Sequence, residues 1–275
     1  MTARRSRFWL ATIASVVLAA TFSLAGASAS AAPQGQAQPK PTVVLVHGAW
    51  ADGSSWNGVV ERLQHDGYPV RVPPNPLRSL PGDSATIASF LATIAGPIVL
   101  VGHSYGGAVI TNAATGNANV KALVYVDAFA PEQGETVLPL SGSGSALAVD
   151  PTTVFDFVPY PGAPAGDIDL YLKQNLFLHS FANGVPTRTA QLLYAAQRPL
   201  ALSAGNEPSG APAWKTIPSW YVLGTADNII TPSQQLFMAH RAKSTIVRVN
   251  AGHLSMVSHP DDVADVITRA AHQTS

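Results

Sequence analysis

One serine stands between two glycines in the pentapeptide Gly102-His-Ser-Tyr-Gly106, which has the pattern G-x-S-x-G. An apolar run at 97–101 precedes the pentapeptide and small residues from Gly107 follow it, which predicts a sharp turn from a buried strand into a helix. Such a turn needs small flanking residues and lifts the central hydroxyl to the carboxyl end of the sheet. We therefore predict that Ser104 is a nucleophile.

A serine hydroxyl is a weak nucleophile at neutral pH and needs a general base. Because the order serine, acid, histidine accompanies this turn, we favour His253, which follows Gly252 in a loop after the last predicted strand. His259 is the alternative, although its place before Pro260 suits a helix start. We expect His103 to pack under the turn. His47 lies in the loop over 47–50, which follows the first predicted strand and which we call the first loop. The remaining histidines are expected to be solvated on helices: His65, His179, His240 and His272.

A histidine base needs a carboxylate that fixes its tautomer. Asp227 follows a predicted strand and lies between Ser104 and His253 in the sequence, so we favour it. Asp127, at the end of the strand after the nucleophile helix, is the alternative acid, because some proteins with this arrangement place the acid there. If Asp227 has the role, Asp127 would shape the pocket or the lid hinge.

The tetrahedral intermediate of acyl transfer carries an oxyanion that backbone N–H groups must hold. One predicted donor is Tyr105, at the start of the helix, and the other is Ala49, in the loop that Gly48 opens. For the substrate pocket the candidates are Trp50, Phe129 and Phe177. Ordinary packing is the alternative for Trp50.

Alternating strands and helices must position these residues, and this alternation predicts an α/β protein with a mostly parallel sheet covered by helices on both faces. We expect six strands and five helices. The predicted strands are 42–46, 70–72, 98–101, 122–126, 220–223 and 245–249; the helices are 54–66, 83–95 with Asp83 as N-cap, one directly after Ser104, and two that start near Thr231 and His259.

Residues 131–217 interrupt the alternation. The segment is rich in proline, glycine and aromatic residues and contains no convincing buried strand. It is too long for an ordinary loop, so we expect an inserted lid. We predict that its helices cover 168–180 and 187–196.

The composition predicts one large domain. The chain has 275 residues, of which 47% are hydrophobic and 12% charged, and its net charge is zero, so nothing indicates nucleic acid as a partner. It contains no cysteine, which excludes disulfides and thiolate metal sites, and we expect no metal. The oligomeric state stays open.

The N-terminal order is typical of an exported protein. Three early arginines, Arg4, Arg5 and Arg7, precede an apolar run over 8–24, and small residues follow at 27–32. We therefore expect a signal peptide over 1–32, cleaved after Ala29 or Ala32, then a flexible lead over 33–40 and a domain over 41–275. A membrane anchor is the alternative; the polar residues in the run favour cleavage, secretion and no stable membrane insertion. The export route stays open.

Four motifs in this order resemble the α/β-hydrolase fold, in particular the branch of small serine esterases that includes methyl-salicylate-type esterases and hydroxynitrile lyases of plants. They are Val43-Val-Leu-Val-His-Gly-Ala-Trp50, Gly102-His-Ser-Tyr-Gly-Gly107, Gly224-Thr-Ala-Asp227 and Gly252-His253. The chain is also similar to secreted actinobacterial members of the fold. The resemblance covers about 41–275 apart from the lid and implies the triad Ser104–Asp227–His253, an oxyanion hole at Ala49 and Tyr105, and no cofactor.

Departures from related families narrow the expected reaction. Epoxide hydrolases and haloalkane dehalogenases of this fold have an aspartate where this chain has Ser104. Hydroxynitrile lyases typically have a threonine where this chain has Gly48 and a lysine where it has Leu254. We therefore expect a serine hydrolase that cleaves carboxylic esters of small to medium, uncharged, partly apolar compounds. A lactonase, an amidase or a carbon–carbon lyase with the same triad is the alternative, and a non-catalytic binding protein is the remote one.

Overall fold

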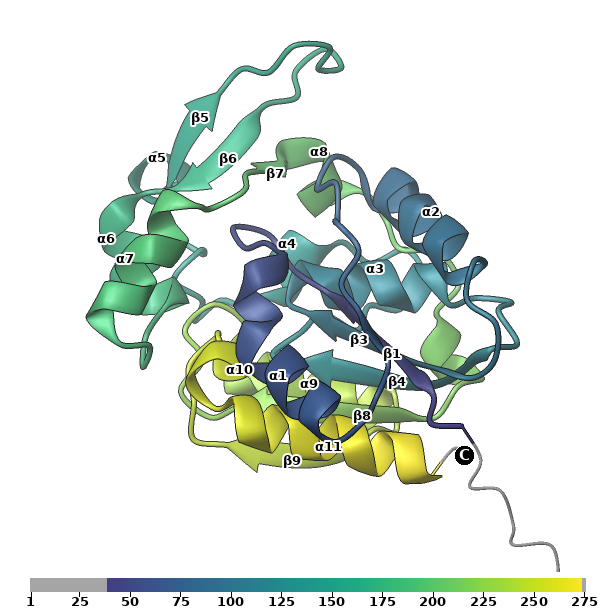
Figure 1. Cartoon of the computed structure of the whole chain (residues 1–275). Coiled ribbons are helices and arrows are strands. Elements are labelled where there is room, and N and C mark those ends of the chain that lie inside the picture. The colour runs from purple at the N-terminus through teal and green to yellow at the C-terminus, as the bar shows by residue number, and fades with distance from the viewer. Residues whose placement is uncertain (1–38, 274–275) are drawn as a thin grey trace, which may run out of the picture. The chain divides into compact units, whose positions relative to one another are not determined.

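The computed structural model describes residues 39–273, in which a six-stranded parallel sheet forms the central layer (Figure 1). Its strands in spatial order are β2 (Val70–Arg71), β1 (Thr42–Val46), β3 (Ile98–His103), β4 (Val120–Val126), β8 (Ser219–Gly224) and β9 (Thr245–Val249). The six predicted strands are confirmed, with ends that differ by at most two residues. The predicted signal peptide lies outside the described residues, as does most of the lead.

The carboxyl ends of the central strands meet at one edge of the sheet. All six residues of β3 are buried, as expected for a strand covered on both faces. Val46 of β1 pairs with Gly102 of β3, which in turn pairs with Tyr125 of β4. The loops that follow these three strands therefore emerge side by side, and they carry most of the predicted site residues.

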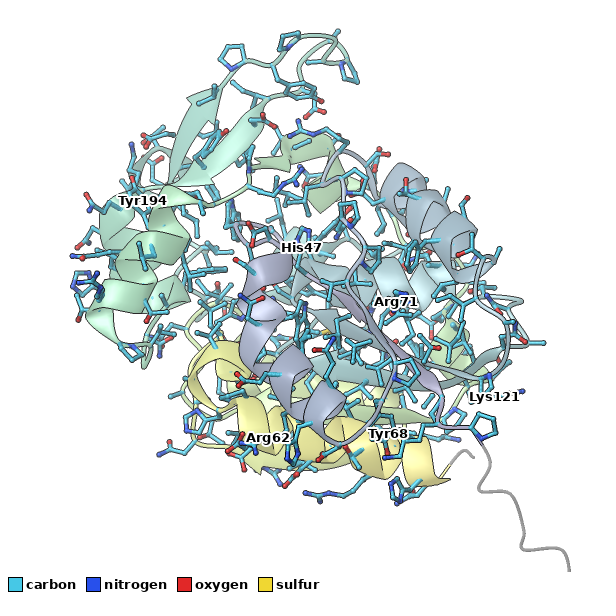
Figure 2. The ribbon with its side chains drawn as sticks, in the orientation of Figure 1. His47, Arg62, Tyr68, Arg71, Lys121 and Tyr194 are labelled. Atoms are coloured by element: carbon cyan, nitrogen blue, oxygen red, sulfur yellow. The ribbon has the colours of Figure 1, made fainter. Side chains whose placement is uncertain are left out.

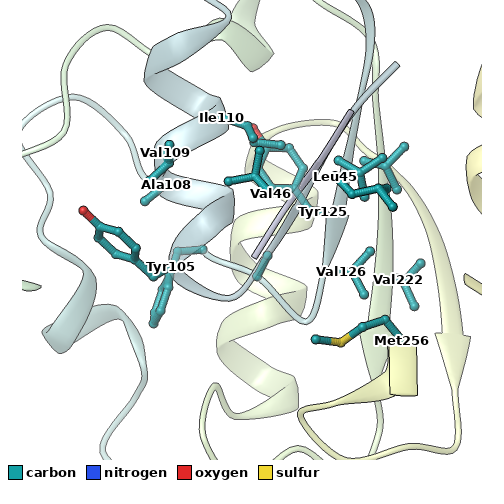
Figure 3. Close-up of a cluster of buried hydrophobic side chains, with 14 of the residues drawn as sticks. Leu45, Val46, Tyr105, Ala108, Val109, Ile110, Tyr125, Val126, Val222 and Met256 are labelled. Carbon is teal, nitrogen blue, oxygen red and sulfur yellow. The ribbon is translucent and has the colours of Figure 1, made fainter. Parts of the chain in front are cut away.

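Helices cover both faces of this sheet (Figure 1). On one face α1 (Asn57–His65) packs against α11 (Pro260–Gln273), and on the other α2 (Leu80–Leu91) packs against α3 (Tyr105–Ala113). Buried side chains from α3, β1, β4 and β8 gather in one cluster (Figure 3). The remaining elements outside the lid are η1 (Gly53–Trp56), α9 (Pro232–Arg241) and α10 (Ser255–Ser258).

The start of α2 differs from the prediction. Ser79, rather than Asp83, is the N-cap, because its hydroxyl accepts a hydrogen bond from the backbone N–H of Gly82. Asp83 is buried in the first turn of α2, where it accepts a hydrogen bond from the hydroxyl of Tyr105. The helix also ends earlier than predicted, at Leu91.

The lid, residues 131–217, contains a second sheet that the sequence analysis did not predict. It is antiparallel, with the strand order β5 (Phe155–Val158), β6 (Asp169–Leu172) and β7 (Leu200–Ala201), and β5 and β6 form a hairpin (Figure 1). The other lid elements are α4 (Val137–Leu140), α5 (Pro151–Val154), α6 (Gln174–Leu176), the π-helical turn η2 (Phe177–Phe181), α7 (Thr187–Ala195), α8 (Leu202–Asn206) and η3 (Ala213–Lys215).

The helix predicted over 168–180 is wrong in its first half, and the prediction that the segment has no buried strand is also wrong. Leu170 and Leu172, two residues apart, are both buried and pair with β5, so their period is that of a strand. Helical structure starts only at Gln174. The second predicted lid helix is present as α7.

None of the helices in residues 39–273 combines the length and apolar character needed to cross a membrane.

Candidate active site

Ser104 lies at the junction of β3 and α3 in a strained backbone conformation. Its φ is +52°, in the left-handed region that residues other than glycine rarely adopt. A Cβ on Gly102 would lie 2.5 Å from the carbonyl oxygen of Gly106, and a Cβ on Gly106 would lie 2.5 Å from that of Val46. Both glycines are therefore required by close backbone contacts, and the turn has the geometry that its sequence pattern indicates.

Ser104, His253 and Asp227 form a continuous chain of hydrogen bonds. The Oγ of Ser104 lies 2.9 Å from Nε2 of His253, and Nδ1 of His253 lies 2.8 Å from Oδ2 of Asp227. When Nδ1 carries the proton and donates to Asp227, Nε2 is free to accept the proton of the serine hydroxyl. The structure thus brings together the three residues that the sequence analysis favoured as nucleophile, base and acid.

Three hydrogen-bond donors hold the buried carboxylate of Asp227, and burial keeps His253 neutral. Oδ1 of Asp227 accepts the backbone N–H groups of Ile229 (2.7 Å) and Ile230 (3.0 Å), and Oδ2 accepts the side-chain amide of Gln235 (2.7 Å). Burial raises the pKa of Asp227, and these three donors oppose that rise. Burial also lowers the pKa of His253 to about 3, so the imidazole is neutral at neutral pH, as a general base must be before it accepts a proton.

Asp127, the alternative acid, binds the chain beyond the histidine instead of the histidine itself. Its Oδ2 accepts the hydroxyl and the backbone N–H of Ser255, while Oδ1 has no hydrogen-bond partner among the described residues. Burial, and then the nearby charge of Asp227, raise the pKa of Asp127. The geometry therefore assigns the histidine contact to Asp227.

Two backbone N–H groups at this edge are free to bind an oxyanion. Those of Ala49 and Tyr105 donate to no acceptor in residues 39–273. The loop that carries Ala49 passes against the nucleophile, since a Cβ on Gly48 would lie 2.7 Å from Cβ of Ser104. Tyr105 is the first residue of α3, where the helix dipole adds partial positive charge.

Asn75, which the sequence did not single out, fixes the start of the first loop by hydrogen bonds to His47. Nε2 of His47 (Figure 2) accepts the backbone N–H of Asn75 at 3.1 Å, and the side-chain amide of Asn75 donates to the carbonyl of His47 at 2.9 Å. Burial lowers the pKa of His47, so its ring is neutral, and its Nδ1 donates to the carbonyl of Gly48. Asn75 lies in a proline-rich loop whose sequence indicates only a turn.

The three predicted pocket residues are all buried, and each contacts a different part of the molecule. Trp50 directly follows Ala49, and Phe129 donates its backbone N–H to the carbonyl of Ser104 at 3.1 Å. The ring of Phe177 packs against Phe181 and against Tyr194 of α7 (Figure 2), with centroids 4.8 and 5.5 Å away.

Phe181 is the aromatic residue that covers the base. Its ring centroid lies 5.2 Å from that of His253 and 5.8 Å from that of Trp50, which it meets edge-on. Phe181 is fully buried, and Ser104 exposes only 2% of its surface. The sequence showed Phe181 as one of several lid aromatics, without a signal that singled it out.

The lid also encloses an apolar cavity of about 410 Å³. Its walls come from α4 and the chain after it, from the β5–β6 hairpin and from α8, and they contain no charged side chain. Two wall residues, Phe155 and Leu170, also contact Trp50, so the cavity lies one residue layer from the first loop. Ser104 is not part of its lining.

The other histidines take no part in the hydrogen-bonded chain. His259 is half-buried and lies beside the Ser258 hydroxyl. Nε2 of His103 donates to the backbone carbonyl of His253, so His103 supports the loop of the base from beneath the turn. The four histidines expected on solvated helices are all exposed: His65, His179, His240 and His272. Within residues 39–273, no cluster of three or more potential metal ligands occurs.

Comparisons with known proteins show the family and the fold of this chain. Residues 43–266 match the alpha/beta hydrolase family. A carbendazim hydrolyzing esterase of Nocardioides sp. (strain SG-4G) is 36% identical over 110 residues, which is 35% of this chain and 46% of that esterase. The alpha/beta hydrolase nvfD of Aspergillus novofumigatus is 27% identical over 84% of this chain and 97% of its own.

The fold is also found among solved structures. The crystal structure of polyneuridine aldehyde esterase superimposes with a TM-score of 0.71 at 17% identity and covers 84% of this chain and 98% of that one. At this identity the likeness concerns the fold, and it confirms the predicted α/β-hydrolase fold with its parallel sheet.

Proposed function

We propose that this chain, which belongs to the alpha/beta hydrolase family, is a serine hydrolase that cleaves carboxylic esters. The observation that carries this function is the continuous hydrogen-bonded chain from Ser104 through His253 to Asp227. Ester cleavage is further supported by the esterase from Nocardioides among the relatives. It is favoured over lyase chemistry because Gly48 and Leu254 replace the residues typical of hydroxynitrile lyases.

In the first half of the reaction, the Oγ of Ser104 attacks the ester carbonyl carbon as Nε2 of His253 takes the hydroxyl proton. The carbonyl π electrons move to the oxygen, which becomes an oxyanion held by the N–H groups of Ala49 and Tyr105. When the intermediate collapses, the carbon–oxygen bond to the alcohol breaks. His253 gives its proton to the departing alcohol, and an acyl-enzyme remains.

In the second half, a water molecule takes the place of the alcohol. His253 accepts a proton from this water as it attacks the acyl carbon, and the same two N–H groups hold the second oxyanion. When this intermediate collapses, the bond between the acyl carbon and Oγ of Ser104 breaks, His253 returns the proton to Oγ, and the acid product leaves. Asp227 keeps the histidine in the required tautomer and stabilises the imidazolium formed in both halves.

The lid supports a substrate that is uncharged and partly apolar. The cavity walls carry no charge, and the rings of Phe155, Trp50 and Phe181 contact one another in a row that ends on His253. A small to medium ester with one apolar portion suits these surfaces, because burial of that portion is favourable and no charged group is left unpaired.

We also propose that the protein is secreted. The order of basic, apolar and small residues over 1–32 supports export with cleavage after Ala29 or Ala32. Expression of the full chain in an actinobacterial host, with mass spectrometry of the N-terminus in the culture fluid, tests this proposal. A mature N-terminus at Ser30 or Pro33 is expected; a full-length chain retained in the membrane fraction would refute it.

Replacing Ser104 by alanine tests the proposed reaction. Ser104→Ala should lose turnover of short p-nitrophenyl esters while its circular dichroism stays that of the wild type, because only the nucleophile is removed. Ser219→Ala is the matched control: this serine is also buried, but it lies at the amino end of β8 beside Ser244 and should retain activity. Turnover by Ser104→Ala would show that the nucleophile is assigned wrongly.

A further inference from the structure

Trp50 joins the first loop to the lid. Its φ is +56°, so a bulky residue occupies the left-handed region directly after the proposed donor Ala49. The backbone N–H of Trp50 donates to the carbonyl of Arg198 at 2.9 Å, and its indole Nε1 donates to the carbonyl of Leu170 at 2.8 Å. Both acceptors belong to the lid, before β7 and in β6.

Ring contacts add to these two hydrogen bonds. The indole stacks on Phe155 of β5, with centroids 5.7 Å apart and an interplanar angle of 28°, and meets the ring of Phe181 edge-on. Trp50 is 3% exposed. Four separate lid segments therefore contact one residue, and that residue is covalently adjacent to an oxyanion donor.

The two ends of the first loop are held by different parts of the molecule. Asn75 holds His47 against the sheet, and Gly48 lies against Ser104, so the beginning of the loop cannot shift independently of the nucleophile. After Ala49, by contrast, the backbone N–H and the side chain of Trp50 both bind the lid. The direction of the Ala49 N–H thus depends on the anchor to the lid as well as on the sheet.

We propose that Trp50 is a positioning residue that couples the lid to the oxyanion hole, so that the hole is complete only while the lid is seated on the indole. This inference rests on the proposed ester hydrolysis. Since hydrogen bonds to a developing oxyanion require well-aligned donors, a small displacement of Ala49 weakens transition-state binding more than ground-state binding. Loss of the lid anchor should therefore lower kcat rather than raise KM.

Trp50→Phe tests this coupling because it retains an aromatic ring for the stack and removes only the hydrogen bond to Leu170. On p-nitrophenyl acetate we expect kcat to fall by about tenfold or more, with KM within about threefold of the wild type; removal of a whole oxyanion donor costs about 10²–10³-fold. In a trifluoromethyl ketone, the Oγ of Ser104 adds to the carbonyl carbon and the carbonyl oxygen becomes an oxyanion. The affinity of Trp50→Phe for this ketone should fall by the same factor as its kcat/KM.

Trp214→Phe is the matched control. Trp214 is also a buried lid tryptophan, 8% exposed, and its Nε1 donates to the carbonyl of Pro131 at 3.0 Å, away from the first loop. The Trp214→Phe variant should lose a comparable hydrogen bond and yet keep the kcat and the ketone affinity of the wild type. Phe155→Leu, which loosens the stack on Trp50 but keeps its hydrogen bonds, gives a second reading if Trp50→Phe does not fold; a smaller loss of kcat and ketone affinity is expected.

Three results would overturn the coupling: wild-type kcat and ketone affinity in Trp50→Phe, or in Phe155→Leu where the former is unfolded; a lower kcat with unchanged ketone affinity; or equal losses in Trp214→Phe. Failure of the ester reaction itself is distinguishable, because the wild-type enzyme would then turn over no ester and bind no ketone.

Discussion

At the scale of single residues, two buried carboxylates lie near the base and only one of them contacts it. Asp227 meets Nδ1 of His253, whereas Asp127 accepts both hydrogen bonds from Ser255. Both aspartates follow the carboxyl ends of neighbouring strands, so the sequence alone does not decide which of them contacts the histidine. The decisive feature is the turn after Asp227, whose N–H groups at Ile229 and Ile230 orient the carboxylate.

Substitution of the two aspartates by asparagine should separate their roles. Asp227→Asn should lower kcat on p-nitrophenyl acetate by roughly 10⁴-fold, because the amide no longer selects the tautomer in which Nε2 accepts a proton. Asp127→Asn, its matched control, should lower kcat by less than about tenfold, since an asparagine oxygen can still accept from Ser255. Steady-state kinetics of both variants decide the matter, and a larger loss in Asp127→Asn would reverse the assignment.

At the scale of elements, the parallel sheet and its turns could be predicted from the sequence, whereas the lid could be predicted only in part. The four central strands β1, β3, β4 and β8 are predominantly apolar, and the nucleophile turn carries its own pattern around Ser104. In the lid, β6 is only four residues long, so the strand period of Leu170 and Leu172 spans a single repeat, too short to distinguish from chance in the sequence. The hairpin is decided by pairing with β5, a distant contact that local sequence does not encode.

The same limit applies to the supporting residues of the site. Asn75 and Gln235 are fully buried and bind His47 and Asp227, yet each stands in a segment whose pattern indicates only a turn or a helix. Their roles depend on which loops the fold brings together. The groups that react were predictable because the nucleophile turn has its own sequence pattern, and the order serine, acid, histidine accompanies that turn.

The lid cavity yields a prediction about substrate size. Leu138→Trp should fill part of the cavity and lower kcat/KM for p-nitrophenyl octanoate by about tenfold or more, while p-nitrophenyl acetate is affected within about twofold. The reason is that each methylene excluded from an apolar wall forfeits about 0.8 kcal/mol. Leu192→Trp, on an exposed face of α7, is the control and should leave both rates unchanged. Equal losses for both esters in Leu138→Trp would mean that the cavity does not hold the apolar portion.

At the scale of the whole molecule, the fold has no cysteine and depends on its core, which nevertheless contains ionisable groups. Asp83 and Asp127 are buried, and burial raises the pKa of both. A carboxyl group whose pKa is higher in the folded state than in the unfolded chain stabilises the fold at low pH, and this contribution is lost as the pH rises through the folded pKa. At neutral and higher pH such groups therefore cost stability.

Asp127→Asn should consequently stabilise the protein more at pH 8 than at pH 4.5, relative to the wild type. Asparagine removes the charge and, like aspartate, tolerates the φ of +45° at this position. The free energy of unfolding from urea titrations at both pH values measures the effect. A gain for Asp127→Asn that is the same at pH 4.5 and pH 8 would contradict the raised pKa.

The central claim is that Ser104, activated by His253, is the nucleophile of an ester hydrolase. Its most direct test is labelling of the folded wild-type protein with a fluorophosphonate, followed by intact-mass measurement and peptide mapping. We expect one phosphonyl group per chain, attached to Ser104, with ester turnover lost in proportion to labelling. An unlabelled Ser104, or an adduct on another residue in a protein that has lost activity, would contradict it.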